Sequence, residues 1–148
     1  MDSREKINDQ IDSYYDLWFK INDVYSDWAK RHHIQENILF ALHVINSAVP
    51  YCTQSQICNK LYLPKQTVSQ MLSGLEKDGY ISKETNPEDR RNKIIKFTEK
   101  GECFAKRILE EMKSAEIEAF SELSEKQRST IIEGLALLNN ALIKSFSK

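Results

Sequence analysis

The sequence has few of the residues that build cross-linked or metal-bound frameworks. It contains only three cysteines, Cys52, Cys58 and Cys103, and no two of them have C-x-x-C spacing. The odd number argues against a disulfide framework, and the spacing argues against a zinc ribbon. Only four glycines occur, and none belongs to a phosphate-binding loop. We therefore expect reduced thiols and no nucleotide site of that kind.

Signals for membrane insertion, catalysis and metal binding are also missing. No apolar run approaches the roughly 18 residues of a membrane span, and residues 1–8 are charged, without the apolar core of a signal peptide. No nucleophile, base and orienting residue form a recognisable motif. His32, His33 and His43 lack the spacing of a metal site. We expect a cytoplasmic protein with no membrane partner, catalytic residue, metal or cofactor.

The charge is unevenly distributed along a chain of ordinary globular composition. The 148 residues are 41% hydrophobic and 29% charged, which predicts one compact domain. The formal net charge is -1, yet residues 53–100 contain nine cations and six anions and carry +3. Phosphate binding depends on the local surface and not on the chain total, so this segment favours contact with nucleic acid.

Apolar periodicity predicts long helices before this basic segment. Large apolar residues recur in steps of three and four from Ile7 to Trp28, which predicts a long first helix. A second helical pattern runs from Ile34 to Ile45, and Pro50 marks its end or the loop just beyond it.

Two short helices joined by a tight turn are predicted next. Thr53 and Gln56 form a capping box, which predicts a helix over residues 54–61. After a turn at Tyr62, Pro64 suits the first position of another helix, which ends near Gly79. This pair is a helix-turn-helix candidate.

The remainder of the chain predicts a hairpin and two helices. Residues 80–83 and 93–97 have strand character, and the residues between them favour turns. Thr98 suits the cap of a helix that continues to Phe120. Ser124 and Gln127 form a second capping box before a last apolar helix. The predicted fold class is mainly α, an α+β winged helix.

The outward face of the second short helix carries the residues best suited to reading DNA. Glutamine can pair with the edge of adenine, serine can donate or accept, and lysine can reach guanine or phosphate. A plain solvated face is the alternative interpretation. The candidate DNA-binding residues of this helix are Lys65, Gln66, Thr67, Ser69, Gln70, Ser73 and Lys77.

The hairpin supplies a second group of candidates, Asp89, Arg90, Arg91 and Lys93. Arginines at the tip of a two-stranded ribbon suit a narrow minor groove. Asp89 is two residues before Arg91, and we expect its carboxylate to hold the Arg91 side chain by a charge-assisted hydrogen bond. A solvated charged turn is the alternative.

The sequence resembles the MarR (multiple antibiotic resistance regulator) family of winged-helix regulators over nearly its whole length. The most specific part runs from Asp89-Arg90-Arg91 through a predicted strand to Thr98 and Gly101. Residues 75–81 resemble the exit of the family's recognition helix. Many members begin that helix with serine or threonine, whereas this chain has Pro64.

The resemblance implies a homodimer that binds a pseudo-palindromic operator in double-stranded DNA, with half-sites about 10 base pairs apart. Arg91 would enter the minor groove, and Arg90 would be an auxiliary. Within a single domain over residues 1–148, we expect a DNA-binding lobe at 34–98, with 1–33 and 99–148 forming an intertwined helical dimerisation region. The expected dimer-interface residues are Ile7, Ile11, Ile131, Leu135, Leu138, Leu142 and Phe146.

The predicted function is sequence-specific transcriptional regulation, as a repressor released by a small aromatic or phenolic effector. Aromatic walls with polar tips suit such a ligand, although an aromatic stripe is more often simply core. Two alternatives stay open: a dimeric protein-interaction module that has kept this fold, and a redox-responsive regulator using Cys103. The candidate effector-pocket residues are Tyr14, Tyr15, Trp18, Phe19 and His43.

Overall fold

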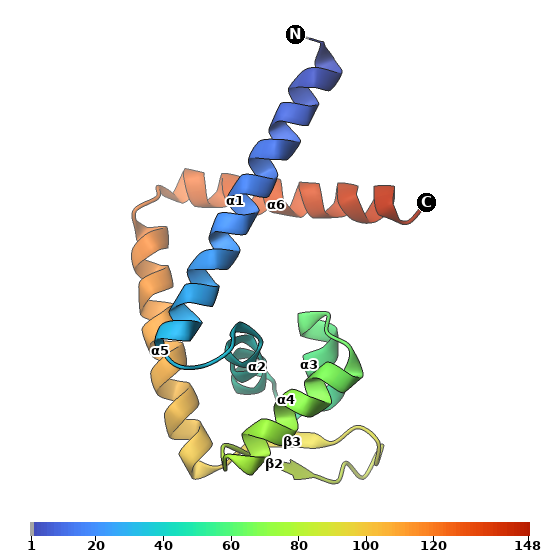
Figure 1. Cartoon of the computed structure of the whole chain (residues 1–148), viewed down its shortest axis with the longest axis vertical. Coiled ribbons are helices and arrows are strands. Elements are labelled where there is room, and N and C mark those ends of the chain that lie inside the picture. The colour runs from blue at the N-terminus through green and yellow to red at the C-terminus, as the bar shows by residue number, and fades with distance from the viewer. Residues whose placement is uncertain (1) are drawn as a thin grey trace. The chain divides into compact units, whose positions relative to one another are not determined.

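The computed structural model describes residues 2–148, and these residues form a mainly helical fold with one small sheet (Figure 1). This confirms the predicted fold class. None of the helices in this range is long and apolar enough to cross a membrane. The elements, in chain order, are α1 (Ser3–Arg31), α2 (Glu36–Ser47), β1 (Cys52–Thr53), α3 (Gln54–Leu61), α4 (Lys65–Lys77), β2 (Ile81–Glu84), β3 (Ile94–Phe97), α5 (Glu99–Ser121) and α6 (Glu125–Phe146).

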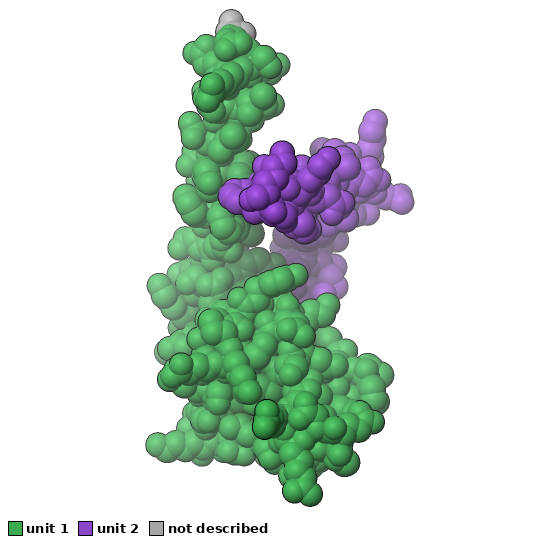
Figure 2. Space-filling view, turned by 90° about the vertical axis from the view of Figure 1, so that its right-hand side faces the viewer, with its two compact units in different colours: residues 1–108 green, residues 109–148 purple. Residues whose placement is uncertain are grey.

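The chain divides into two compact units, which Figure 2 distinguishes by colour. The first unit, residues 1–108, contains α1 to α4, the sheet and the beginning of α5. The second unit, residues 109–148, contains the remainder of α5 and α6.

The core of the first unit lies between α2, α3, α4 and the sheet. Its largest fully buried side chains include Leu42 from α2, Ile57 from α3, Leu72 from α4 and Ile95 from β3. The apolar residues Val68, Met71, Leu72 and Leu75 of α4 are all buried. Apolar burial therefore fixes which face of α4 is left for solvent or a partner.

The helix-turn-helix begins at a capping box, as predicted. The Thr53 Oγ1 atom accepts from the Gln56 backbone N–H at 3.3 Å, and Gln56 Oε1 accepts from the Thr53 N–H at 2.9 Å. Tyr62 ends α3 in the left-handed region with φ 54°. Pro64 is the N-cap of α4 and not its first helical residue, because its ψ of 147° keeps it extended. The position predicted for Pro64 was thus wrong by one residue.

Gly79 ends α4 with a φ of 82°, a conformation that glycine adopts without strain. The backbone N–H of Gly79 donates to the Glu76 carbonyl, and that of Tyr80 donates to the Leu75 carbonyl. This is the Schellman pattern, and it turns the chain directly into β2.

The wing is an antiparallel hairpin of β2 and β3 in which Ile81 pairs with Phe97. A further strand, β1, was not predicted from the sequence: its Cys52 and Thr53 pair with Ile95 and Ile94 on the other side of β3. The sheet order is β1-β3-β2. A two-residue strand shows no periodicity, and only the tertiary pairing reveals it.

Thr98 connects the wing to α5. Its backbone N–H donates to the Tyr80 carbonyl, and its hydroxyl donates to the Gly79 carbonyl and accepts from the Gly101 N–H. Gly101 is buried so closely against the Tyr80 backbone that an added Cβ would lie 1.7 Å from the carbonyl oxygen. Only glycine fits at this contact.

The second unit contains the second predicted capping box. The Ser124 hydroxyl accepts from the Gln127 N–H at 3.1 Å, and Gln127 Oε1 accepts from the Ser124 N–H at 2.9 Å. No residue of α6 is buried, although the helix carries large apolar side chains such as Leu135 and Phe146. An apolar helix with no buried residue has a face that needs a further surface to cover it.

We predict that Gly101→Ala destabilises the protein by about 3 kcal/mol, because the new methyl group must displace the Tyr80 backbone. Gly74→Ala is the control, since no atom lies within 4 Å of an added Cβ there. That change should stabilise the helix by about 0.5–1 kcal/mol. Urea denaturation followed by circular dichroism measures both, and equal midpoints for the two variants would contradict the account of Gly101.

Candidate nucleic-acid interface

The outward face of α4 carries exposed polar and basic side chains. Gln66, Gln70, Ser73 and Lys77 are all exposed, and so is Lys65 at the helix start. The predicted flanking residues Thr67 and Ser69 are only partly buried. The helix therefore presents one apolar face to the core and one hydrogen-bonding face away from it.

Lys83 of β2 contacts this outward face, although the sequence did not predict it as a residue of the site. Its Nζ donates to Ser73 Oγ at 3.2 Å and lies 3.9 Å from a carboxylate oxygen of Glu76. These contacts tie the wing strand to α4. No local pattern in the sequence could have indicated them, since they depend on how β2 packs beside the helix.

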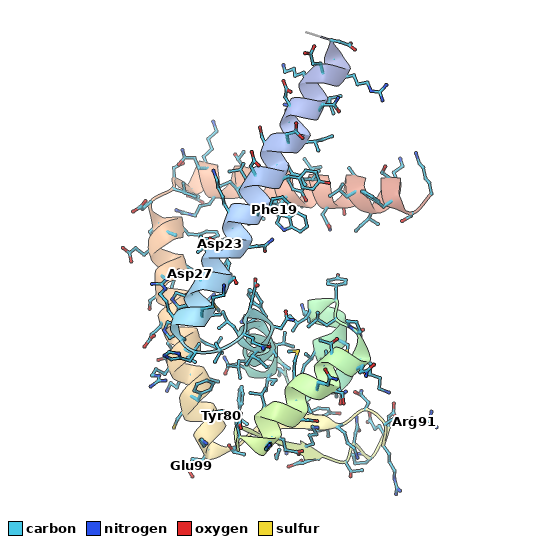
Figure 3. The ribbon with its side chains drawn as sticks, in the orientation of Figure 1. Phe19, Asp23, Asp27, Tyr80, Arg91 and Glu99 are labelled. Carbon is cyan, nitrogen blue, oxygen red and sulfur yellow. The ribbon has the colours of Figure 1, made fainter. Side chains whose placement is uncertain are left out.

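The tip of the wing is ordered by side chains that accept from its own backbone. Asn86 is buried, and its Oδ1 accepts from the Glu88 N–H at 3.1 Å. Asp89 Oδ1 accepts from the backbone N–H of Arg91 at 3.0 Å. This corrects the expected contact with the Arg91 side chain: Asp89 fixes the backbone, and Arg91 lies at the free end of the hairpin (Figure 3).

A groove of about 410 Å³ lies between the wing and the two helices of the helix-turn-helix. Lys65 and Arg91, two of the predicted DNA-binding cations, both line it. Two further predicted residues lie apart from this lining: Arg90 is exposed, and Lys93 is partly buried and accepts from the Gln54 N–H through its carbonyl. The lining residues are Gln54, Ser55, Cys58, Asn59, Lys65, Asp89, Arg91 and Asn92.

A second cleft, of about 630 Å³, lies along the other flank of α4. Thr67, Gln70 and Gly74 of α4 line it, opposite residues of the α1–α2 loop and the start of α2. Tyr80 and Phe104, whose rings stack at 4.4 Å between centroids, also line it. Apolar walls with amide and hydroxyl groups suit a small organic ligand.

The predicted effector residues lie on two helices, α1 and α2. Tyr14, Tyr15, Trp18 and Phe19 form a run of neighbouring rings along α1, and the last three are exposed. His43 lines a separate hollow of about 540 Å³ with side chains of α2 and α3. None of the α1 aromatics lines this hollow beside His43.

The three cysteines are all free thiols in different surroundings. Cys52 is 2% exposed, and burial raises the pKa of its thiol from 9.0 to about 11, which keeps it protonated at neutral pH. Cys58 is partly buried, whereas Cys103 is exposed. Among residues 2–148, no three His, Cys, Asp or Glu side chains are grouped so that they could hold a metal ion.

Comparison with known proteins identifies the family of the helix-turn-helix segment. The profile of the MarR family matches residues 39–92, which contain α3, α4 and the wing tip. NMB1585, a MarR family regulator from Neisseria meningitidis, superposes with a TM-score of 0.81 at 25% identity, over 93% of this chain and 96% of its own. Residues 39–92 are a MarR-family winged helix-turn-helix segment. This match and the shared fold support the interpretation of the chain as a DNA-binding transcriptional regulator.

Two further proteins are similar to this chain, one in sequence and one in fold. The HTH-type transcriptional regulator PapX of Escherichia coli is 29% identical over 90 residues, which are 60% of this chain and 55% of PapX. The chain thus spans about half of that relative. Staphylococcus aureus MarR, solved in complex with salicylate and kanamycin, has a TM-score of 0.75 at 18% identity, over 95% of this chain and 94% of its own. At that identity the likeness concerns the fold alone.

Proposed function

We propose that this protein is a sequence-specific regulator of transcription that binds double-stranded DNA as a homodimer in the cytoplasm. The observation that carries the proposal is the pairing of an exposed hydrogen-bonding face on α4 with an ordered wing whose free end bears Arg91. A helix and a ribbon of these dimensions suit the major groove and the adjacent minor groove, respectively.

In this proposal α4 supplies most of the sequence preference. Gln66 and Gln70 can each make paired hydrogen bonds to the N6 and N7 edge of an adenine. Lys65 and Lys77, near the two ends of the helix, can contact guanine or backbone phosphate. Ser73 accepts from Lys83, and its hydroxyl proton remains free to donate to a base.

The wing supplies affinity and position. Arg91 enters the minor groove, while its backbone is held by Asp89. Arg90 is exposed beside it and is proposed to contact phosphate. The partly buried Lys93 adds a third cation close to the backbone of the duplex.

We predict that Arg91→Ala weakens binding to most duplexes and reduces the salt slope by about 1, because one cation leaves the DNA surface. Gln70→Ala should instead relax the preference at particular base pairs by about 1–3 kcal/mol. The control is Arg4→Ala, which removes the same charge from an exposed site on α1. Fluorescence anisotropy at several salt concentrations, with duplexes selected from a random pool, measures these effects.

Two results would overturn the assignment. If replacing both Arg91 and Gln70 left the affinity for DNA unchanged, neither proposed contact would exist. Salt-insensitive or absent binding to every duplex, together with stable capture of a specific protein, would favour the protein-interaction alternative.

In the proposed homodimer, a second copy of the chain covers the apolar side chains that are exposed on α1 and α6. On α1, Ile7 and Ile11 are 52% and 44% exposed. On α6, Ile131 and Leu135 are 45% and 56% exposed, and Phe146 is more exposed still. Helices with so much exposed apolar surface favour association, and residues 1–33 and 99–148 are the proposed dimerisation region around a DNA-binding lobe at 34–98.

We predict that Leu135→Glu shifts the protein from dimer to monomer, because a carboxylate cannot be buried unpaired in an apolar interface. Leu138 and Leu142 share this face with Leu135 and should respond in the same way. The control is Glu133→Lys, on the opposite side of α6. Sedimentation velocity should give one chain mass, 17.3 kDa, for the first variant and twice that for the second. A monomeric wild-type protein would refute the homodimer.

We further propose repression that a small phenolic effector releases, with the cleft beside α4 as its site. The supporting observation is that Thr67, Gln70 and Gly74 line this cleft, so a ligand there contacts the DNA-reading helix itself. A ligand in this cleft can contact α4 differently in the free and the DNA-bound protein. A ligand shifts the equilibrium between these two states only if it binds one of them more tightly than the other.

Salicylate is the probe for this site. We predict that Gly74→Leu, which places a side chain in the cleft, abolishes salicylate-induced release of DNA while DNA binding persists. Gly74→Ala adds only a methyl group and should retain the release. Release that survives Gly74→Leu but is lost in Tyr14→Ala would return the effector site to the α1 aromatics. Release by oxidation, and its loss in Cys103→Ser, would favour the redox alternative.

A further inference from the structure

We propose that Asn92 is a positioning residue for DNA binding: it fastens the wing to the first turn of α3 and thereby holds Arg91 in the orientation that enters the groove. The inference rests on the proposed function, since the wing must meet DNA for the orientation of Arg91 to matter.

The N-terminus of α3 is the surface to which the wing is fastened. The first N–H groups of a helix have no acceptor within the helix and must find one elsewhere. Gln54 donates to the carbonyl of Lys93 at 3.0 Å, and Ser55 donates to Oδ1 of Asn92 at 3.0 Å. The next N–H, that of Gln56, is satisfied by the Thr53 cap. Two of the first three donors of α3 are therefore used by the wing.

This arrangement changes what the N-terminus of α3 can do. A helix N-terminus with free N–H groups is a common binding site for phosphate. Here the donors of Gln54 and Ser55 already have acceptors from the wing. We infer that this end of α3 serves as an anchor for the hairpin, and that cations of the groove, Lys65 and Arg91, are left to meet the DNA backbone.

Arg91 lies between two fixed points. On one side, Asp89 Oδ1 holds the backbone N–H of Arg91 at 3.0 Å. On the other side, Asn92 donates its own N–H to the Asp89 carbonyl and accepts from Ser55, 37 residues earlier in the chain. With the backbone held on both sides, binding DNA has to order little more than the arginine side chain, which lowers the entropic cost of the contact.

The side chain at position 92 must supply an acceptor, and asparagine supplies one without a charge. Asn92 lines the groove that faces the proposed DNA backbone. An aspartate would keep the acceptor oxygen for Ser55 but add repulsion toward phosphate. An alanine would remove the acceptor and leave the Ser55 N–H to water. The alanine substitution therefore tests the anchoring of the wing, and the aspartate substitution tests the effect of a negative charge in the groove.

The experiment is a double-mutant cycle between Asn92→Ala and Arg91→Ala, with affinity measured on a duplex that the wild-type protein selects from a random pool. Alone, Asn92→Ala should weaken binding about 2- to 10-fold, the effect of one lost hydrogen bond. In the Arg91→Ala background it should have less than about a 2-fold effect, because no arginine remains to be positioned. Asn46→Ala, at an exposed site on α2 outside this groove, is the matched control.

Amide hydrogen exchange gives a second readout that does not depend on DNA. Exchange of the Ser55 N–H should accelerate in Asn92→Ala and remain slow in Asn92→Asp, while Gln56, held by Thr53, stays protected in both. Rescue of Ser55 protection by aspartate identifies the acceptor oxygen as the group that matters.

Each outcome decides the proposal. Equal losses of affinity from Asn92→Ala in both backgrounds would show that Asn92 acts independently of Arg91 and would overturn it. Unaltered Ser55 exchange in Asn92→Ala would also overturn it. If Arg91→Ala weakens DNA binding but Asn92→Ala does not, the proposed function stands and the positioning role fails. If the wild-type protein binds no duplex, the proposed function fails and the positioning role falls with it.

Discussion

The close approach of α5 to the carbonyl of Tyr80 is the constraint on which the placement of the wing depends. This one oxygen accepts from the Thr98 N–H, and the missing side chain of Gly101 lets the helix backbone pack against it. The Tyr80 ring then stacks on Phe104 of the same helix. The end of α4, both strands of the hairpin and the start of α5 thus meet at one junction. Any side chain at position 101 would separate elements that the DNA-facing surface needs together.

A second junction lies at the other end of the hairpin, where residues 92 and 93 accept hydrogen bonds from backbone N–H groups of α3. A two-stranded ribbon is weakly stable when held at one end only. Here it is fixed at its base by α5 and near its tip by α3, and Lys83 adds a contact with α4 along its length. The hairpin is consequently a third rigid component of the helix-turn-helix and not a mobile appendage.

Local signals predicted the ends of the helices well, because capping is decided within a few residues. Both capping boxes and the glycine at the end of α4 occur as the sequence indicates. Contacts across long separations were not predictable: β1 is too short to show periodicity, and Asn92 meets Ser55 only after the chain has folded back. The failed contact between Asp89 and the Arg91 side chain has a related cause, because the backbone N–H two residues ahead is the nearer donor.

The candidate site could be predicted in its outline but not in its pockets. Periodicity places the polar side chains of α4 on one face, and the structure leaves that face exposed. Periodicity also groups the aromatics of α1, but it cannot say that His43 faces a different hollow or that a cleft lies beside α4. Cavities arise from how helices pack, which a single helical pattern does not contain.

The separation of charge explains how a chain with a net charge of -1 can be suited to DNA. Asp23 and Asp27 lie on α1, whereas Arg91 lies at the far end of the hairpin in the same unit (Figure 3). Electrostatic interactions between exposed charges are screened over about 8 Å at physiological salt. Acidic side chains on α1 therefore do little to repel a duplex at the wing, and the local cations govern encounter and affinity. It follows that neutralising α1 aspartates should matter far less for DNA binding than removing one cation from the groove between α3 and the wing.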